Sequence, residues 1–298
     1  MSRKRLVVTG LHGQVVTSLM ERAEQRAAFE VFPLGRPQLD LAAPESIAAA
    51  IEAARPDAIV SAAAYTAVDQ AETEEELAMR TNGVSAGEIA RAADRLGVPI
   101  IHLSTDYVFD GSKAIPYVEE DPTAPVSAYG RSKLTGELAV RDATDNHAIL
   151  RIAWIYSPFG KNFLKTMLAL AQTRDALSVV DDQVGNPTSA LDIADGILTV
   201  GENLVSNEAA SLRGIFHMAS AGEASWADFA EEIFDRSRTK GGPSARVNRI
   251  SSNEYPTLAK RPVNSRLGCR KLKDAHGIML PSWQSSTAVV VDRVVGAL

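Results

Sequence analysis

The chain has 298 residues, of which 45% are hydrophobic and 23% charged, values typical of a globular protein with a sizeable core. Its net charge of −6 argues against nucleic acid or an anionic membrane as a partner, because both require a basic surface. The single cysteine, Cys269, excludes an internal disulfide. No apolar run approaches membrane-spanning length, so we expect a cytoplasmic protein.

The first half of the chain alternates short apolar runs with longer helical patterns. The predicted strands cover residues 6–9, 31–34, 58–62, 98–103 and 148–151. The predicted helices cover residues 14–28, 44–54, 74–96 and a segment around Tyr129. Continuous apolar strands separated by helices indicate a parallel sheet covered on both faces. The predicted fold class is therefore α/β, a doubly wound parallel sheet of the Rossmann-like type.

The second half of the chain, beyond about residue 155, is less regular. The patterns predict helices over residues 162–173 and 225–236, short strands over 178–180 and 214–218, and a loop over 238–244. We predict a dinucleotide-binding domain over residues 1–154, with interleaved pieces near 176–220. A smaller, interleaved substrate-binding domain would occupy most of residues 155–298.

A glycine-rich turn connects the first predicted strand to the first predicted helix, with the sequence Thr9-Gly-Leu-His-Gly13-Gln14-Val15-Val16. Glycine permits a tight turn and lets the backbone approach a pyrophosphate at a helix N-terminus. Dinucleotide-binding turns of this kind often read G-x-x-G-x-x-G, and Val16 replaces the third glycine here. An ordinary strand-to-helix turn has the same composition, but the position after the first strand favours a cofactor site.

Cofactor choice is expected to depend on residues beyond the second predicted strand. Arg36 favours NADPH, because an arginine there accommodates the additional phosphate, with Asp40 four residues further on. A solvated loop arginine is an equally good explanation, so NADH stays open. After the third strand, the triplet Ala62-Ala63-Ala64 offers a floor of small residues for an adenine or ribose, although plain packing would produce the same triplet.

Tyr129 and Lys133 are four residues apart, so on a helix they share one face. A phenol beside an ammonium group makes a proton donor whose pKa lies below the value of about 10 of free tyrosine. Such a pair suits carbonyl reduction or its reverse, but spacing alone is weak evidence. Gly130 between them either makes room for a ligand or allows close packing on the sheet.

The segment Ser104–Gly111 follows a buried apolar strand. Hydroxyl groups and a carboxylate at a strand tip favour a ligand site, because parallel sheets bind ligands at their carboxyl edge. A solvated turn closed by Asp110 and Gly111 is the alternative.

Together, the glycine turn, Ser104-Thr-Asp-Tyr-Val-Phe-Asp-Gly111 and the Tyr129/Lys133 pair resemble an extended short-chain dehydrogenase/reductase. Further segments narrow the resemblance to the dTDP-4-dehydrorhamnose reductase family: Ala63-Ala-Tyr-Thr-Ala-Val-Asp69, Asp181-Asp-Gln-Val-Gly-Asn-Pro-Thr-Ser189, Ser225-Trp226 and Arg261-Pro-Val-Asn-Ser-Arg-Leu267. These segments are more diagnostic than the glycine turn, because the general dehydrogenase fold does not require them.

The resemblance implies reduction of the 4-keto group of dTDP-4-dehydro-6-deoxy-L-mannose to dTDP-L-rhamnose, a precursor of cell-surface polysaccharides such as lipopolysaccharide. Tyr129 would donate the proton, Lys133 would lower its pKa and bind the nicotinamide ribose, and Thr105 would bond the substrate oxygen. With Tyr129 and Lys133, the cofactor-binding residues would be Gly10, Gly13, Gln14, Val15, Arg36, Asp40, Leu41, Ala62, Ala63 and Ala64. The nucleotide-sugar would contact Thr105, Asp106, Trp154, Asn186 and Arg261.

Ser18 departs from the family pattern, because some relatives bind magnesium between subunits through a glutamate at this position. Serine cannot replace that carboxylate, so no metal is predicted, and a homodimer is left open. The alternatives are another nucleotide-sugar reductase, epimerase or dehydratase of the same superfamily, and a non-catalytic NADP-binding regulatory subunit. Tyr107 stands where a dehydratase typically has a glutamate, which argues against water elimination. The presence of both Tyr129 and Lys133 argues against the regulator.

Overall fold

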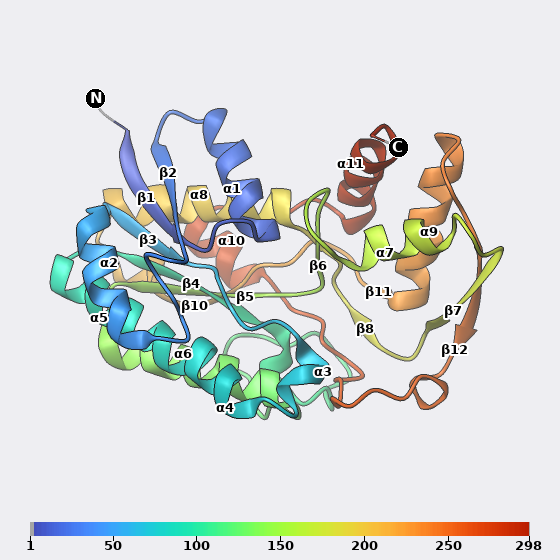
Figure 1. Cartoon of the computed structure of the whole chain (residues 1–298), viewed down its shortest axis with the longest axis horizontal. Helices are drawn as coiled ribbons and strands as arrows, with labels where there is room; N and C mark the ends of the chain where they lie inside the picture. The colour runs from blue at the N-terminus through green and yellow to red at the C-terminus, as the bar shows by residue number, and fades with distance from the viewer. Residues whose placement is uncertain (1–2, 298) are drawn as a thin grey trace.

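The computed structural model describes residues 3–297 and contains a six-stranded parallel sheet with strand order β10-β5-β4-β3-β1-β2 (Figure 1). The strands are β1 Lys4–Thr9, β2 Phe29–Leu34, β3 Ala58–Ser61, β4 Ile100–Thr105, β5 His147–Ile152 and β10 Gly214–His217. The chain changes direction across the sheet between β1 and β3. Doubly wound sheets bind ligands outside the strand ends at this point, and the predicted fold class is confirmed.

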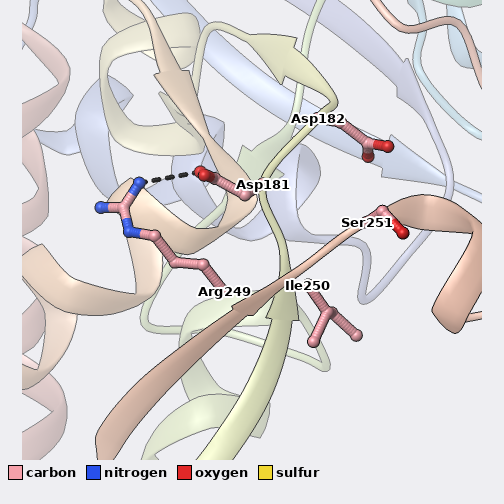
Figure 2. A pocket seen from close by; sticks show the side chains of 5 residues that line it. All are labelled: Asp181, Asp182, Arg249, Ile250 and Ser251. Carbon is pink, nitrogen blue, oxygen red and sulfur yellow. Dashed lines mark hydrogen bonds and ion pairs between the residues drawn. The ribbon is translucent and has the colours of Figure 1, made fainter.

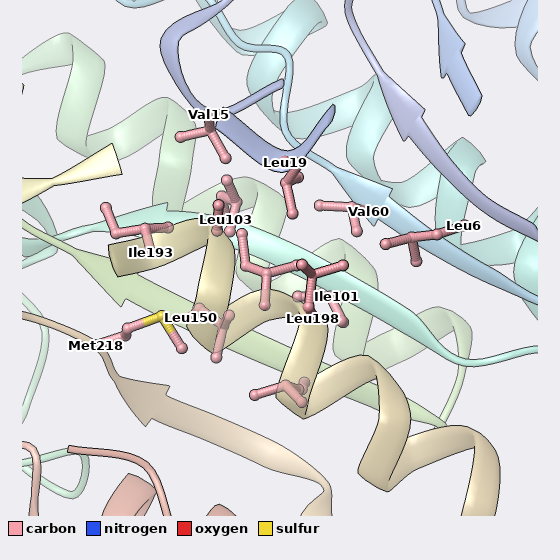
Figure 3. Close-up of a cluster of buried hydrophobic side chains, with 14 of the residues drawn as sticks. Leu6, Val15, Leu19, Val60, Ile101, Leu103, Leu150, Ile193, Leu198 and Met218 are labelled. Carbon is pink, nitrogen blue, oxygen red and sulfur yellow. The ribbon is translucent and has the colours of Figure 1, made fainter. Parts of the chain in front are cut away.

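Helices cover both faces of this sheet (Figure 1). One face packs against α1 Gln14–Glu24, α8 Ala190–Ser206 and α10 Arg270–His276, and the other against α2 Ile47–Ala54, α5 Ser85–Leu96 and α6 Ala128–Ala143. Figure 3 shows the first interface, where Leu6, Val60 and Leu150 of the sheet meet Leu19 and Ile193 of the helices. Because alternate strand residues enter opposite cores, both faces exclude water and the strands read as continuous apolar runs.

A smaller layer lies beside the large sheet (Figure 1). Its parallel strand pair, β7 Ala176–Val180 with β12 Arg246–Ile250, packs with α7 Phe163–Leu170, α9 Trp226–Thr239 and α11 Trp283–Val295 around a separate apolar core. Two short strand pairs lie between the sheet and this layer: β6 Ile155–Tyr156 with β9 Thr188–Ser189, and β8 Val184–Gly185 with β11 Ala224–Ser225. Within residues 3–297, no helix is long and apolar enough to cross a membrane.

The chain returns to the large sheet after entering the smaller layer. Helix α8, strand β10 and helix α10 pack with the sheet, whereas β7, which falls in the predicted interleaved piece near 176–220, pairs with β12 in the smaller layer. The division into domains at residues 154 and 155 stays a prediction.

Several element boundaries differ from the predicted ones. Helix α1 ends at Glu24 rather than at residue 28, because the carbonyl of Ala28 accepts the N–H of Lys4 and starts the β1–β2 pairing. Helix α9 continues to Thr239, into the predicted loop. The long predicted helix over residues 74–96 consists of α4 Glu75–Ala78, a π-helical turn at Met79–Val84 and α5.

Helices α8, α10 and α11 and strand β12 are absent from the predicted elements. Helix α8 contains Gly196 and Gly201 with several β-branched residues, a composition that weakens the helix signal. Its glycines are instead contact points: a Cβ on Gly196 would lie 2.8 Å from Met218 Cε, and one on Gly201 would lie 3.1 Å from Phe29 Cε2. Tertiary packing therefore stabilises a helix that local propensity does not indicate.

Candidate active site

The glycine turn and the alanine triplet lie side by side at the carboxyl edge of the large sheet. The Thr9 hydroxyl at the end of β1 accepts the backbone N–H groups of Ala62 (2.9 Å) and Ala63 (3.0 Å) after β3. Gly10 has a φ of +103°, a conformation that favours glycine. A Cβ on Gly10 would also approach the Ala63 Cβ to 3.4 Å. The predicted cofactor floor is thus joined directly to the predicted pyrophosphate turn.

The N-terminus of α1 has the features of an anion site. Gly13 at the N-cap provides no side-chain cap, and the first turn contains no acidic residue. The first N–H groups of a helix have no intrahelical partner, and they carry the positive end of the helix dipole. Together with the small Gly10, this donor set fits a diphosphate. Val16 is buried and packs beside Gly10, where a Cβ would lie 3.4 Å from its Cγ2.

The other predicted cofactor residues differ in what they contact. The Gln14 side-chain oxygen accepts from Ser157 Oγ (2.8 Å) and Asn162 Nδ2 (3.0 Å), so it ties the turn to the segment after β6. Arg36 is exposed beyond the end of β2. Asp40 closes its own turn by accepting the N–H of Ala42 (2.9 Å), and the Leu41 carbonyl accepts from Ser85 Oγ (2.6 Å). Their roles in cofactor binding stay predictions.

Helix α6 carries Tyr129 and Lys133 to the tip of β4. Ser127 caps the helix by accepting the N–H of Gly130 (3.1 Å). A Cβ on Gly130 would lie only 2.3 Å from the Tyr107 carbonyl oxygen, so close packing explains this glycine. This contact holds the first turn of α6 against the segment that follows Thr105.

Lys133 is 4% exposed and donates to the Leu103 carbonyl oxygen at 2.6 Å. Desolvation lowers the pKa of Lys133 to about 8, while the Glu137 carboxylate acts in the opposite direction. Desolvation raises the pKa of the half-buried Tyr129 to about 12, and a hydrogen bond with Thr105 lowers it in part. The expectation that Lys133 brings this pKa below about 10 is therefore wrong for this structure. Burial sets the pKa of Tyr129, and the Lys133 ammonium group bonds to the Leu103 carbonyl instead.

Asp106 is a buried carboxylate with one free oxygen. Its side chain is 2% exposed; Oδ1 accepts from Thr105 Oγ1 (2.9 Å), and Oδ2 has no partner among the described residues. Desolvation raises the pKa of Asp106 to about 7, although the hydroxyl groups of Ser265 and Thr105 lower it in part. A buried acceptor without a partner at a strand tip fits a ligand that brings a donor, such as a sugar hydroxyl.

Asn82 supports helix α6 and was not predicted from the sequence. It lies on the π-helical turn, a feature often found at functional sites. Its side chain accepts the N–H of Tyr65 (2.7 Å) and donates to Ser132 Oγ (2.9 Å), next to Lys133. A polar residue with poor helix propensity inside a predicted helix was the available signal.

A buried ion pair beneath the site was also not predicted from the sequence. Glu137 and Arg151, with side chains 1% and 3% exposed, form two hydrogen bonds of 2.9 and 2.8 Å. Ser104 also donates to Glu137, so both carboxylate oxygens have partners. Glu137 lies one helical turn after Lys133, and Ser104 directly follows Leu103 on β4. The pair and Ser104 thus link helix α6 to β4 and β5.

Trp154, two residues beyond β5, has a φ of +44°, which is rare for a bulky residue and costs on the order of 1–3 kcal/mol. Its indole Nε1–H donates to Ser265 Oγ (3.1 Å). Such strain persists only where surrounding contacts impose it, and it is concentrated at functional sites. This geometry supports a ligand-facing role for Trp154.

The side chains of Asn186 and Arg261 are engaged within the chain. Asn186 donates to the Gly222 carbonyl (2.7 Å) and accepts the N–H of Leu267 (2.8 Å). Arg261 forms an ion pair of 2.7 Å with Asp69 on α3 Val68–Ala71, which draws the segment around residue 261 toward the first half of the chain. Their contacts with a substrate stay predictions.

A cavity of about 270 Å³ lies at the end of the β7–β12 pair, lined by Asp181, Asp182, Arg249, Ile250 and Ser251 (Figure 2). Arg249 forms ion pairs with Asp181 (2.8 Å), Asp228 (2.7 Å) and Glu231 (2.6 Å). No predicted site residue lines this cavity. Across residues 3–297, no group of three or more histidine, cysteine or acidic side chains is placed to hold a metal ion.

Comparison with known proteins gives consistent matches. Residues 4–295 match the family model described as RmlD substrate binding domain. A dTDP-4-dehydrorhamnose reductase of Sinorhizobium fredii is 53% identical over 289 residues, 96% of each chain, and the Escherichia coli K12 enzyme of that name is 42% identical over 82% of each chain. The crystal structure of the Bacillus anthracis dTDP-4-dehydrorhamnose reductase in complex with NADP matches with a TM-score of 0.89 at 32% identity, covering 97% of this chain and 98% of that one.

Proposed function

The chain belongs to the RmlD substrate binding domain family, and from this premise we propose that it is an NADPH-dependent reductase of dTDP-4-dehydrorhamnose. The reaction reduces the 4-keto group of dTDP-4-dehydro-6-deoxy-L-mannose and gives dTDP-L-rhamnose. The observation that carries the proposal is the placement of Thr105, Tyr129 and Lys133 at the carboxyl end of β4, on the same edge of the sheet as the uncapped N-terminus of α1.

The chain would hold NADPH along the β1–β3 edge. Backbone N–H groups of Gly13, Gln14 and Val15 would bind the diphosphate, with Gly10 and the alanine triplet allowing close approach. Arg36 would bind the additional phosphate, and Lys133 and Tyr129 would bind the nicotinamide ribose. When bound, the cofactor supplies the hydride.

Tyr129 is the proton donor in this proposal. Its raised pKa of about 12 keeps the proton on the phenol oxygen at neutral pH, as an acid requires. Thr105, which contacts the phenol, would bond the substrate carbonyl oxygen. As the proton leaves, a phenolate forms, and the buried ammonium of Lys133 stabilises it more strongly than it stabilises the neutral phenol.

Asp106 and Trp154 would bind the sugar. The free Oδ2 of Asp106 accepts a sugar hydroxyl, and the indole provides an apolar wall. Asn186 would hold the segment around Leu267 at the substrate site, and Arg261 would bind the nucleotide diphosphate. A homodimer and a cytoplasmic location stay predictions from the sequence.

The proposal is tested by following cofactor oxidation at 340 nm with the dTDP-linked 4-keto sugar and with its GDP- and UDP-linked analogues. We expect turnover only with the dTDP compound. Tyr129→Phe should abolish turnover and leave NADPH binding largely intact, because the proton donor is lost while most of the cofactor contacts stay. Tyr107→Phe is the matched control, since Tyr107 packs edge-to-face on Tyr129 with ring centroids 5.9 Å apart. Near-normal turnover in Tyr129→Phe would reject the assigned role.

Cofactor preference has a separate test. Arg36→Ala should weaken NADPH binding by about tenfold or more and leave NADH binding nearly unchanged, because only NADPH carries the additional phosphate. The Michaelis constants of both cofactors measure this. Equal losses for the two would dismiss Arg36 as the phosphate ligand.

A further inference from the structure

A column of aromatic rings runs from the end of β5 into the core of the smaller layer. The indoles of Trp154 and Trp226 are stacked, with ring centroids 3.6 Å apart and planes inclined by only 2°. Behind Trp226 lies Phe163 of α7, with ring centroids 4.7 Å apart, and Phe163 in turn contacts Phe229 of α9 at 5.4 Å. Trp226 therefore joins Trp154 to a packed apolar core.

The edge of the Trp154 indole and its backbone are held by other contacts. Nε1–H donates to Ser265, and the Trp154 carbonyl accepts the N–H of Thr188 (3.1 Å). A Cβ on Gly185 would lie 2.5 Å from Cε2 of the indole, so no larger residue fits there. These contacts limit where the ring edge lies. The face of the ring lies flat against Trp226.

Trp154 lies close to the catalytic strand tip. In the sheet register, Thr105 at the end of β4 pairs with Ile152 at the end of β5, so Trp154 extends beyond this edge beside Asp106. The free oxygen of Asp106 and the indole of Trp154 thus flank the same edge of the sheet. The cofactor turn, by contrast, lies at the β1–β3 end of that edge.

Resting on the proposed function, we propose that Trp226 is a positioning residue for sugar recognition, which fixes the Trp154 indole as a flat wall of the sugar subsite. Trp226 acts through Trp154 and does not itself touch the reacting atoms. A fixed flat aromatic face suits the apolar C–H surface and the methyl group of a 6-deoxysugar. A ring free to rotate would lose this shape and would have to be ordered on binding.

Kinetic constants distinguish a positioning role of Trp226 from a general loss of structure in the variant. Trp226→Ala should raise the KM for the dTDP-linked keto sugar by about tenfold or more, while the KM for NADPH changes by less than about twofold. Trp226→Phe keeps a flat ring and should give an intermediate value, and it serves as the working variant if the alanine variant does not fold. An unchanged sugar KM in Trp226→Ala, or in Trp226→Phe if only that variant folds, would overturn the proposal. Equal increases for sugar and NADPH would overturn it as well.

The stack itself has a spectroscopic signature. The chain contains three tryptophans, so a ¹⁵N-labelled sample gives up to three indole N–H resonances. Trp226→Phe should remove one and shift that of Trp154, which loses the ring current of the stacked indole. Trp283→Phe is the matched control: it also removes one indole but leaves the stack, so the Trp154 resonance should keep its position. An unshifted Trp154 resonance in Trp226→Phe would overturn the proposed stack in solution.

Failure of the inference and failure of the proposed function are distinguishable. A wild-type chain that turns over the keto sugar, with variants that leave the sugar KM unchanged, would reject only the role of Trp226. A wild-type chain that neither turns over nor binds a dTDP-linked sugar would reject both.

Discussion

Two buried carboxylates near the end of β4 have opposite surroundings. Glu137, between α6 and the sheet, has both oxygens bonded, to Arg151 and Ser104. Asp106, at the strand tip, has one oxygen bonded to Thr105 and the other without a partner in the described chain. Both side chains are almost fully buried. The carboxylate beneath α6 thus has a donor on each oxygen, whereas the carboxylate at the strand tip has one oxygen without a donor in the described chain.

The difference separates support from ligand recognition. A buried carboxylate with donors on both oxygens holds together the elements that supply them, whereas one with a free acceptor is costly unless a ligand supplies the donor. Burial raises the pKa of Asp106 to about 7, because the charged carboxylate is unfavourable in this desolvated site. The Glu137 region therefore ties α6 to the strands, and the Asp106 region is where we expect a substrate to supply the missing donor.

The largest effect is expected from breaking the buried Glu137–Arg151 ion pair. Glu137→Gln would leave the Arg151 guanidinium buried opposite a neutral amide, and losing one partner of a buried ion pair costs about 3–5 kcal/mol of unfolding free energy. Urea unfolding measures this. The matched control is Glu75→Gln, which breaks the exposed pair between Arg131 of α6 and Glu75 of α4 (2.8 Å) and should cost less than about 1 kcal/mol. Equal losses would contradict the comparison.

A smaller, pH-dependent effect is expected from Asp106→Asn, which removes the buried charge. Because the folded pKa of about 7 lies above the unfolded value, the wild type loses stability as pH rises from the unfolded pKa to the folded one. The stability advantage of the variant should therefore grow by about 1.4 kcal/mol per pH unit between pH 5 and pH 7 and then level off.

Unfolding at several pH values tests this prediction, with the sugar KM expected to rise in the same variant. Asp110→Asn is the control. Hydrogen bonds from Ser112 hold the pKa of the exposed Asp110 below its usual value, so its contribution should stay constant over this range. A flat difference for Asp106→Asn would contradict the assigned burial cost.

The smallest effect is expected in the pH profile of catalysis. Desolvation lowers the pKa of Lys133 to about 8, so kcat/KM should fall by up to about tenfold per pH unit above this value as the ammonium is lost. Because Glu137 raises this pKa, Glu137→Gln should move the alkaline limb to lower pH, while Glu75→Gln leaves it in place. If the alkaline limb does not move in Glu137→Gln, Glu137 does not set the pKa of Lys133 and serves only in packing.

Local patterns in the sequence were sufficient for the first half of the fold. Each strand from β1 to β5 contains a short apolar run. The glycine turn after β1 and the polar segment after β4 mark the carboxyl edge of the sheet. The doubly wound sheet and the edge that carries the candidate site were therefore predictable. Helix α8 was not, because Gly196 and Gly201 weaken its local signal and gain their meaning only from Met218 and Phe29 across the interface.

The sequence by itself determined the glycine turn, the Tyr129/Lys133 spacing and the family resemblance, because each is encoded by residues close together in the chain. Only the tertiary structure decided how these groups are charged and held. Lys133 bonds to Leu103, and Asp106 is left with a free oxygen. Glu137 meets Arg151, and Trp154 meets Trp226. These contacts join distant segments, and desolvation, which sets the pKa values, exists only once the chain is packed.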